Sequence, residues 1–92
     1  MIWYVYLLVC SDKTIYTGIT PDLKRRLKQH NAGCASKYTR SRLPVKMVYF
    51  EEHASRGDAL KKEAQVKKAL SLLVVSSLKT MLLILSAFQS PE

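Results

Sequence analysis

The chain has 92 residues, enough for one domain with a single modest core and too few for two. Hydrophobic residues make up 48% and charged residues 24%, a composition that excludes wholesale disorder. The formal net charge of +8 favours a polyanionic partner, with nucleic acid first and an acidic membrane surface as the alternative.

The first third of the chain is predicted to form a β-hairpin followed by a basic helix. Residues 2–10 are almost continuously apolar, β-branched and aromatic, which is typical of a buried strand. Residues 11–13 supply the turn, and residues 14–19 form the return strand. Thr20, which a proline follows, is a natural N-cap, so the helix is expected from there to about Asn31.

The rest of the domain adds one strand and one helix. Residues 34–44 form a basic connector with room for a short helical turn, and residues 45–52 form a third strand. Ser55 and Asp58 have the spacing of a capping box, which opens a helix reaching about Leu70. The order is β-β-α-β-α, so the fold class is α+β, a small sheet with helices.

The segment 71–92 is apolar and differs from the domain formed by residues 1–70. A membrane span is not favoured, because a lysine near its middle, Lys79, costs about 2.5–3.5 kcal/mol on insertion. We expect a helix that packs on the domain or that joins two copies into a homodimer.

The cysteines and the N-terminus favour a cytoplasmic protein. Cys10 lies in an apolar run and Cys34 in a loop, with no spacing typical of a zinc site or a disulfide framework. This usage indicates a reducing compartment. The apolar N-terminus has no basic leader and no small-residue cleavage site, so no signal peptide is expected.

The hairpin register decides where two tyrosines point. With a loop formed by residues 11–13, Tyr6 lies opposite Gly18, whose missing side chain leaves space above the sheet. Tyr16 then lies on the same face as a diagonal neighbour of Tyr6, about 7–8 Å away. A loop of two residues would put the tyrosines on opposite faces, and both also fit a plain role as core aromatics.

Two side chains of the first helix border its buried stripe. Leu23 and Leu27 mark the stripe, and Arg26 and His30 follow the same spacing beside it. We therefore expect packing to hold Arg26 in place. Taken singly, Arg26 also fits an ordinary surface charge, and His30 fits a partner for the C-terminal helix dipole.

An acidic residue falls inside the inner stripe of the last predicted helix. Glu63 shares that stripe with Val66 and Leu70, and a carboxylate there is costly unless it is paired or binds a cation. The simplest explanation is an ion pair with Lys67, four residues later.

Two phenols, a guanidinium, an imidazole and an inward carboxylate could meet at one concave site. Phosphodiester hydrolysis uses this set of groups. A carboxylate holds a divalent metal, and a cation stabilises the developing charge. A base, such as a phenol relayed through histidine, activates water.

Four sequence motifs in this order resemble the GIY-YIG nuclease superfamily: "YVY" at 4–6, "YTG" at 16–18, "DLKRRLKQH" at 22–30 and "LKKEAQVKK" at 60–68. The resemblance covers about residues 2–70 and is closest to the small stand-alone bacterial members. It implies a three-stranded antiparallel sheet flanked by helices. It also implies metal-dependent cleavage of DNA that leaves a 3′-hydroxyl and a 5′-phosphate, in repair or recombination.

Carried over by position, the resemblance implies five catalytic residues: Tyr6, Tyr16, Arg26, His30 and Glu63. The resemblance makes Glu63 the ligand of one Mg²⁺ or Mn²⁺ ion and leaves open which tyrosine is the base. The expected partner is double-stranded or branched DNA. The residues expected to contact it are Arg25, Lys37, Arg40, Arg42 and Lys67. The three of these in the connector could instead only keep that segment soluble.

The sequence departs from the family pattern at a few positions. Tyr4 replaces the glycine of GIY, and Thr17 replaces the isoleucine of YIG. Many members carry an asparagine in the final helix, whereas the only asparagine of this chain is Asn31. A noncatalytic nucleic-acid-binding module of the same fold is therefore the second hypothesis.

Overall fold

The structure, a computed structural model, describes residues 1–72, so the predictions for the segment 71–92, including the homodimer, lie outside the described residues except for the first two positions. The described elements are β1 (Trp3–Val9), β2 (Ile15–Thr20), α1 (Leu23–Asn31), α2 (Lys37–Arg40), β3 (Lys46–His53) and α3 (Arg56–Leu72). The α+β prediction is confirmed, and α2 is the short helical turn expected in the basic connector. Within residues 1–72, no helix is long and apolar enough to cross a membrane.

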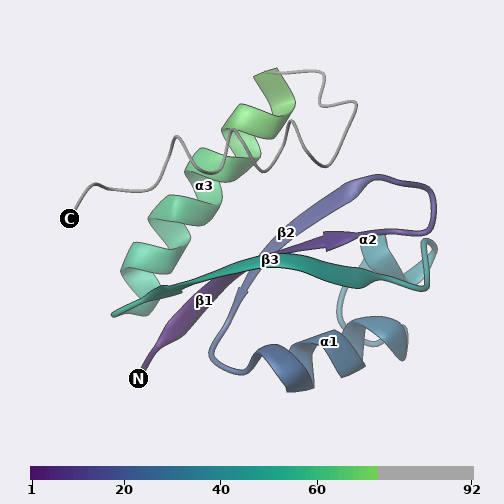
Figure 1. Cartoon of the computed structure of the whole chain (residues 1–92), viewed down its shortest axis with the longest axis horizontal. Coiled ribbons are helices and arrows are strands. Elements are labelled where there is room, and N and C mark those ends of the chain that lie inside the picture. Colours follow the sequence, from purple (N-terminus) through teal and green to yellow (C-terminus); the bar gives the residue numbers. More distant parts are fainter. Residues whose placement is uncertain (73–92) are drawn as a thin grey trace.

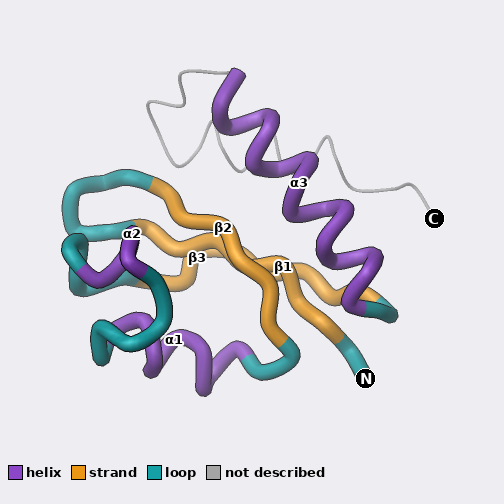
Figure 2. Tube along the Cα trace, turned by 180° about the vertical axis from the view of Figure 1, so that it is seen from behind, coloured by secondary structure: helices purple, strands orange, loops and turns teal. Residues whose placement is uncertain are grey.

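The three strands form one antiparallel sheet in the order β2-β1-β3. The central strand is β1, and its continuous apolar run agrees with the packing of helices on both faces of the sheet. Figures 1 and 2 show α3 on one face of the sheet and α1 and α2 on the other. Residues 1–72 therefore form three layers, with the three-stranded sheet between α3 on one face and α1 and α2 on the other.

The hairpin has the register expected from a loop of residues 11–13. Tyr6 pairs with Gly18, and the amide of Cys10 donates to the carbonyl of Thr14 at 2.9 Å. Lys13 closes the turn in the left-handed region, with φ of 71°. Even-numbered side chains of both strands consequently share the face that α1 covers.

Two small hydrophobic cores lie on the two faces. On the α1 side, Tyr6, Leu8 and Cys10 are buried, and Leu23 and Leu27 of α1 pack against them. This confirms the predicted stripe of α1. On the α3 side the buried centre is made by two residues, Leu7 and Val66. Because β1 contributes to both cores, its alternation of side chains couples the two layers of helices.

The predicted start of α1 is wrong by two residues. The helix begins at Leu23, and the N-cap is Asp22, whose carboxylate accepts from the amide of Arg25 at 3.1 Å. Thr20 is not a cap because it still belongs to β2, paired with Tyr4. Its hydroxyl accepts instead from the amide of Asp22 at 3.1 Å, which shapes the short link between strand and helix.

The start of α3 follows its predicted cap. The hydroxyl of Ser55 accepts from the amide of Asp58 at 3.1 Å, and Val66 faces the sheet as expected. Lys62 is also buried, which the apolar stripe did not indicate. Its ammonium lies 3.8 Å from Glu51 of β3, so an ion pair contributes to the attachment of α3 to the sheet.

Candidate active site

The phenol of Tyr6 lies on the α1 side of the sheet and passes over Gly18 of β2. A Cβ atom added to Gly18 would lie 2.5 Å from Oη and 2.7 Å from Cζ of Tyr6. Any side chain at this position would therefore displace the phenol. Tyr6 is 1% exposed, so its position is set by packing on all sides.

A chain of polar contacts runs from Tyr6 into the protein. Its Oη atom lies 2.8 Å from Nε2 of His30, and Nδ1 of the same imidazole lies 2.8 Å from Oγ1 of Thr39. His30 and Thr39 are fully buried. Both ring nitrogens of His30 are thus within hydrogen-bond distance of a buried partner. The alternative that His30 serves only as a partner for the dipole of the helix does not describe these contacts.

Arg26 approaches the same phenol from the preceding turn of α1. Its Nε atom donates to Oη of Tyr6 at 3.4 Å, and Nη1 donates to Gln29 at 3.2 Å. Arg26 is half-buried, whereas the neighbouring Lys24 and Arg25 are exposed. The prediction that packing holds this arginine is confirmed.

Burial keeps both hydrogen-bonded groups neutral. It raises the pKa of Tyr6 to about 12, against a smaller lowering by the hydrogen bond from Arg26; among weaker effects, the charge of Glu63 raises it. Burial, with a lesser contribution from the charge of Arg26, lowers the pKa of His30 to about 4. At neutral pH the phenol therefore keeps its proton and the imidazole has only one.

Tyr16 completes an aromatic cluster at the edge of the sheet. Its ring centroid lies 6.5 Å from that of Tyr6, 5.1 Å from that of His30 and 6.0 Å from that of Tyr38. It also lines a cavity of about 380 Å³ together with Lys67 of α3. The cavity lies beside β2, the edge strand of the sheet, so residues of α2 and of α3 both line it.

The structure places Glu63 on the α3 side of the sheet, across from the phenol of Tyr6. No hydrogen bond within residues 1–72 joins it to the other four predicted catalytic residues. The charge of Glu63 is the weakest of the effects that raise the pKa of Tyr6. Its side chain is 17% exposed and lies 3.6 Å from Nζ of Lys67, so the expected ion pair is present.

Glu63 is the predicted site residue that could hold a divalent metal ion. The described residues contain no group of three or more histidine, cysteine, aspartate or glutamate side chains that could hold an ion. Mg²⁺ commonly keeps several waters and binds one or two carboxylates together with substrate phosphates. Glu63 can supply such a carboxylate, since its contact with Lys67 is longer than a hydrogen bond.

Arg42, predicted to contact DNA, has structural partners. Its Nε atom lies 3.0 Å from a carboxylate oxygen of Asp12 in the hairpin turn. Its guanidinium also lies 4.0 Å from the ring centroid of Tyr38, and Nη1 donates to the carbonyl of that residue at 2.8 Å. Arg42 therefore ties the hairpin to α2, whereas Lys37 and Arg40 are exposed.

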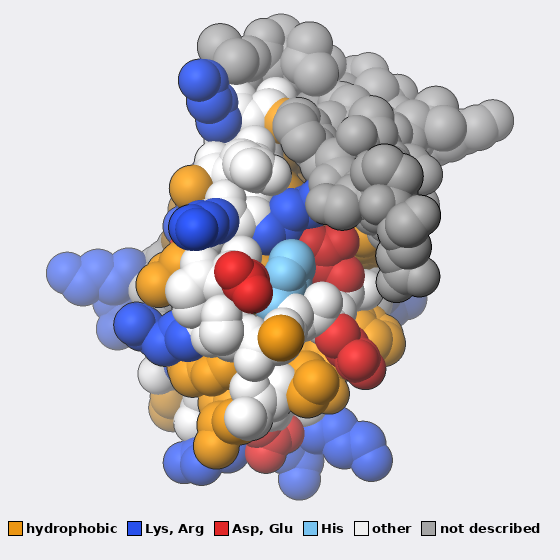
Figure 3. All heavy atoms as spheres, turned by 90° about the vertical axis from the view of Figure 1, so that its left-hand side faces the viewer, with side chains coloured by type: hydrophobic (Ala, Val, Ile, Leu, Met, Phe, Trp, Pro, Cys, Tyr) orange, Lys and Arg blue, Asp and Glu red, His pale blue; other side chains and the backbone are white. Residues whose placement is uncertain are grey.

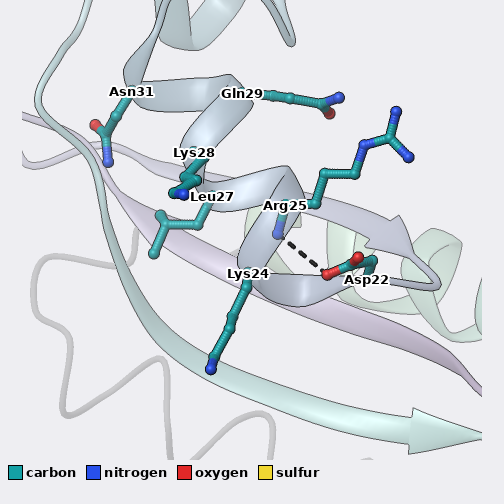
Figure 4. A pocket seen from close by; sticks show the side chains of 7 residues that line it. All are labelled: Asp22, Lys24, Arg25, Leu27, Lys28, Gln29 and Asn31. Carbon is teal, nitrogen blue, oxygen red and sulfur yellow. Dashed lines mark hydrogen bonds between the residues drawn. The ribbon is translucent and has the colours of Figure 1, made fainter.

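The exposed cations of α1 border a shallow hollow of about 910 Å³, lined by Asp22, Lys24, Arg25, Leu27, Lys28, Gln29 and Asn31 (Figure 4). Figure 4 shows Lys24 and Arg25 extending to different sides of the helix. None of the predicted catalytic side chains lines this hollow.

On another face, shown in Figure 3, acidic side chains and a histidine gather among lysines and arginines. Such a mixed face suits a polyanion less well than α1 does.

Asn31 and Thr39 have roles that the sequence did not indicate. The side-chain amide of Asn31 accepts from the amide of Val45 at 2.8 Å and donates to its carbonyl at 3.2 Å. It therefore holds the end of α1 beside the start of β3 and does not replace the family's asparagine in the last helix. Thr39 had one usable signal: Ser36, three residues earlier, has the spacing of a helix cap.

Comparison with known proteins identifies the family of this chain. A family model described as the GIY-YIG catalytic domain matches residues 2–72. The chain therefore belongs to the GIY-YIG family, a family of nucleases that acts on DNA.

The relatives are small bacterial proteins. A UPF0213 protein of Streptococcus pyogenes serotype M5 is 55% identical over 65 residues, which cover 71% of each chain. One from Streptococcus agalactiae serotype V is 54% identical over 71% of this chain and 74% of its own. The solution NMR structure of a UPF0213 protein from Bacillus halodurans is 35% identical, with a TM-score of 0.51 over 99% of this chain and 89% of that one. The NMR structure of an E. faecalis protein is 33% identical, with a TM-score of 0.58 over 100% and 94%.

Proposed function

We propose that this protein is a metal-dependent DNA endonuclease or nickase that hydrolyses phosphodiester bonds in the cytoplasm, in DNA repair or recombination. The observation that carries the proposal is the buried phenol of Tyr6, held between the guanidinium of Arg26 and the imidazole of His30. A tyrosine packed only as a core aromatic needs neither contact. The same three groups suit a base that must lose and regain a proton.

In the proposed reaction Tyr6 is the general base. Its own proton moves from Oη to Nε2 of His30 while Oη takes a proton from water. The oxygen of that water attacks phosphorus, the bond from phosphorus to O3′ breaks, and O3′ takes a proton from solvent. Arg26 stabilises the negative charge that Oη carries during the transfer, because its Nε–H already points to that atom.

Glu63 is the proposed ligand of one Mg²⁺ or Mn²⁺ ion that substrate phosphate and water share with it. The ion supplies Lewis-acid polarisation of the phosphoryl oxygen and stabilises the leaving oxygen. Lys67, 58% exposed beside Glu63, has the position to pair with a phosphate when the carboxylate binds the cation. Exposed Arg25, Lys37 and Arg40 contact the DNA backbone in this proposal, double-stranded or branched.

The test compares Glu63→Gln with wild type on supercoiled plasmid and on a branched DNA, with Mg²⁺, with Mn²⁺ and with chelator. We expect metal-dependent nicking by the wild type and a loss of about 10²–10⁴-fold in rate for the variant. Binding of DNA should change little. Glu52→Gln is the matched control, because Glu52 is an exposed glutamate on β3, outside the proposed site.

Two results would contradict the endonuclease. If the wild type binds DNA but does not nick it with either metal, the noncatalytic binding module, suggested by the missing asparagine, is the better description. Nicking that persists in Glu63→Gln at the wild-type rate would mean that this carboxylate does not hold the ion, or that the activity comes from a contaminant.

A further inference from the structure

We propose that Thr39 is a positioning residue that holds His30 in the tautomer with hydrogen on Nδ1, leaving Nε2 bare to receive the proton of Tyr6. The assignment of the tautomer is argued from hydrogen-bond geometry. Its consequence for catalysis rests on the proposed function.

The hydrogen bonds of Tyr6 require that Nε2 of His30 has no hydrogen. The Oη atom of Tyr6 accepts from Nε–H of Arg26 at 3.4 Å, and an arginine can only donate. The phenol therefore satisfies its own hydrogen elsewhere, and Nε2 of His30 lies 2.8 Å away. Tyr6 can donate to Nε2 only if this nitrogen carries no hydrogen of its own.

The other side of the imidazole leads to the same result. Oγ1 of Thr39 lies 2.8 Å from Nδ1 of His30, and it donates to the carbonyl of Ser36 at 3.4 Å. With its hydrogen directed to that carbonyl, the hydroxyl accepts from Nδ1–H. Burial lowers the pKa of His30 to about 4, so the ring has a single hydrogen to share between the two sides.

The opposite tautomer leaves buried groups unsatisfied. If Nε2 carried the hydrogen, Oη of Tyr6 would accept from both His30 and Arg26, and its own hydrogen would have no acceptor among the described residues. A buried hydroxyl without a hydrogen-bond partner is destabilising. The observed contacts instead form one directed series, from Arg26 through Tyr6, His30 and Thr39 to the carbonyl of Ser36.

The short helix α2 gives Thr39 a fixed place. The hydroxyl of Ser36 caps the helix by accepting from the amide of Thr39 at 3.3 Å. Thr39 is fully buried, and its β-branched side chain has few allowed rotamers. A hydroxyl fixed in this way can select a tautomer across the connector, nine residues from His30 in the sequence.

The test is a long-range ¹H–¹⁵N correlation spectrum of the imidazoles in the full-length protein at pH 7. The chain has two histidines, and His53→Gln assigns the signals. We expect wild-type His30 to carry its hydrogen on Nδ1. Thr39→Val, which keeps the shape and removes the acceptor, leaves Nδ1–H without a partner and should raise the population with hydrogen on Nε2, and Thr39→Ser should restore Nδ1–H.

A second variant separates Thr39 from Tyr6 as the residue that sets the tautomer. In Tyr6→Phe the hydroxyl of Thr39 is intact, so Nδ1–H should persist. Nε2–H in the wild type would overturn the proposal, and this result does not depend on whether any variant folds. Unchanged Nδ1–H in Thr39→Val, or its loss in Tyr6→Phe, would also overturn it.

Nicking assays connect the tautomer to catalysis. Thr39→Val should reduce kcat by on the order of 10–100-fold with little change in KM for DNA, and Thr39→Ser should recover most of the rate. Full activity in Thr39→Val would overturn the catalytic part. If the tautomer shifts as expected but the wild type has no nuclease activity, the proposed function fails while the assignment of the tautomer stands.

Discussion

At the scale of single residues, His30 is the side chain most affected by folding. Its imidazole is fully buried between Tyr6 and Thr39, and both of its nitrogens have partners. Burial lowers the pKa of His30 to about 4, so the ring is neutral in the resting folded protein at pH 7. The unfolded chain has no such restriction, because its histidine titrates near its usual value.

This difference predicts how stability depends on pH. The contribution of His30 to the free energy of unfolding is fully present above pH 6.5. It is lost as the pH falls toward 4, because in this range only the unfolded state takes up the proton. We expect a loss of about 2–3 kcal/mol in the free energy of unfolding between pH 6.5 and 4.5. Urea unfolding at a series of pH values measures it.

The control for this experiment uses both histidines. His30→Gln should flatten the pH dependence over the same window, whereas His53→Gln should retain it. An unchanged slope in His30→Gln would assign the effect to carboxylates and contradict the neutral, buried imidazole.

Single residues also mark the limit of prediction from this sequence. Arg26 could be assigned to a packed position because its spacing from Leu23 and Leu27 is helical and local. Thr39 and Arg42 could not be assigned, because their partners His30 and Asp12 are reached across a connector and a hairpin turn. Long-range contacts of this kind depend on the path of irregular backbone, which residue spacing does not encode.

At the scale of elements, the close approach of β1 and β2 at Gly18 predicts a sharp effect of one methyl group. In Gly18→Ala the new Cβ would overlap Tyr6, so the phenol must move away from His30. We expect a loss of about 1–3 kcal/mol in stability, typical of overpacking, together with a large loss of nicking. Thermal unfolding and the plasmid assay measure the two effects.

Gly57→Ala is the matched control for Gly18→Ala. Its nearest neighbour, Oγ of Ser55, would be 3.8 Å from the added Cβ, an ordinary contact. The substitution lies in α3, where alanine is favoured over glycine, so stability should stay the same or rise. A Gly18→Ala protein as stable and active as Gly57→Ala would contradict the described position of Tyr6.

The elements themselves were largely predictable, since each follows from a local pattern. The hairpin register follows from its loop, and the stripe of α1 follows from helical spacing. The start of α1 was misplaced because Thr20 has the chemistry of a cap but remains paired in β2. Sheet pairing is a tertiary effect, and here it prevailed over local helix preference.

At the scale of the whole molecule, the net charge of +8 predicts DNA binding that weakens steeply with salt. The exposed cations of α1 are expected to carry part of this effect. In a Glu63→Gln background, replacing Lys24, Arg25 and Lys28 with glutamine should reduce the slope of log K against log salt by about 0.9 for each phosphate that the protein no longer neutralises. Fluorescence anisotropy with a labelled duplex measures the slope.

A change of equal size elsewhere tests whether the position of the charge matters. Replacing Lys13, Lys46 and Lys61, which are exposed outside α1, removes the same charge. If both triple variants lower the slope equally, only the overall charge attracts DNA and α1 is not the binding surface.

The central strand β1 gives one side chain after another to opposite cores, Tyr6 and Leu8 to one and Leu7 to the other. Neither half of the sandwich can melt without removing the support of the other, so residues 1–72 should denature cooperatively. Heat or denaturant would then disrupt the surroundings of Tyr6 and of Glu63 together, and a partly molten form with one intact half would not accumulate.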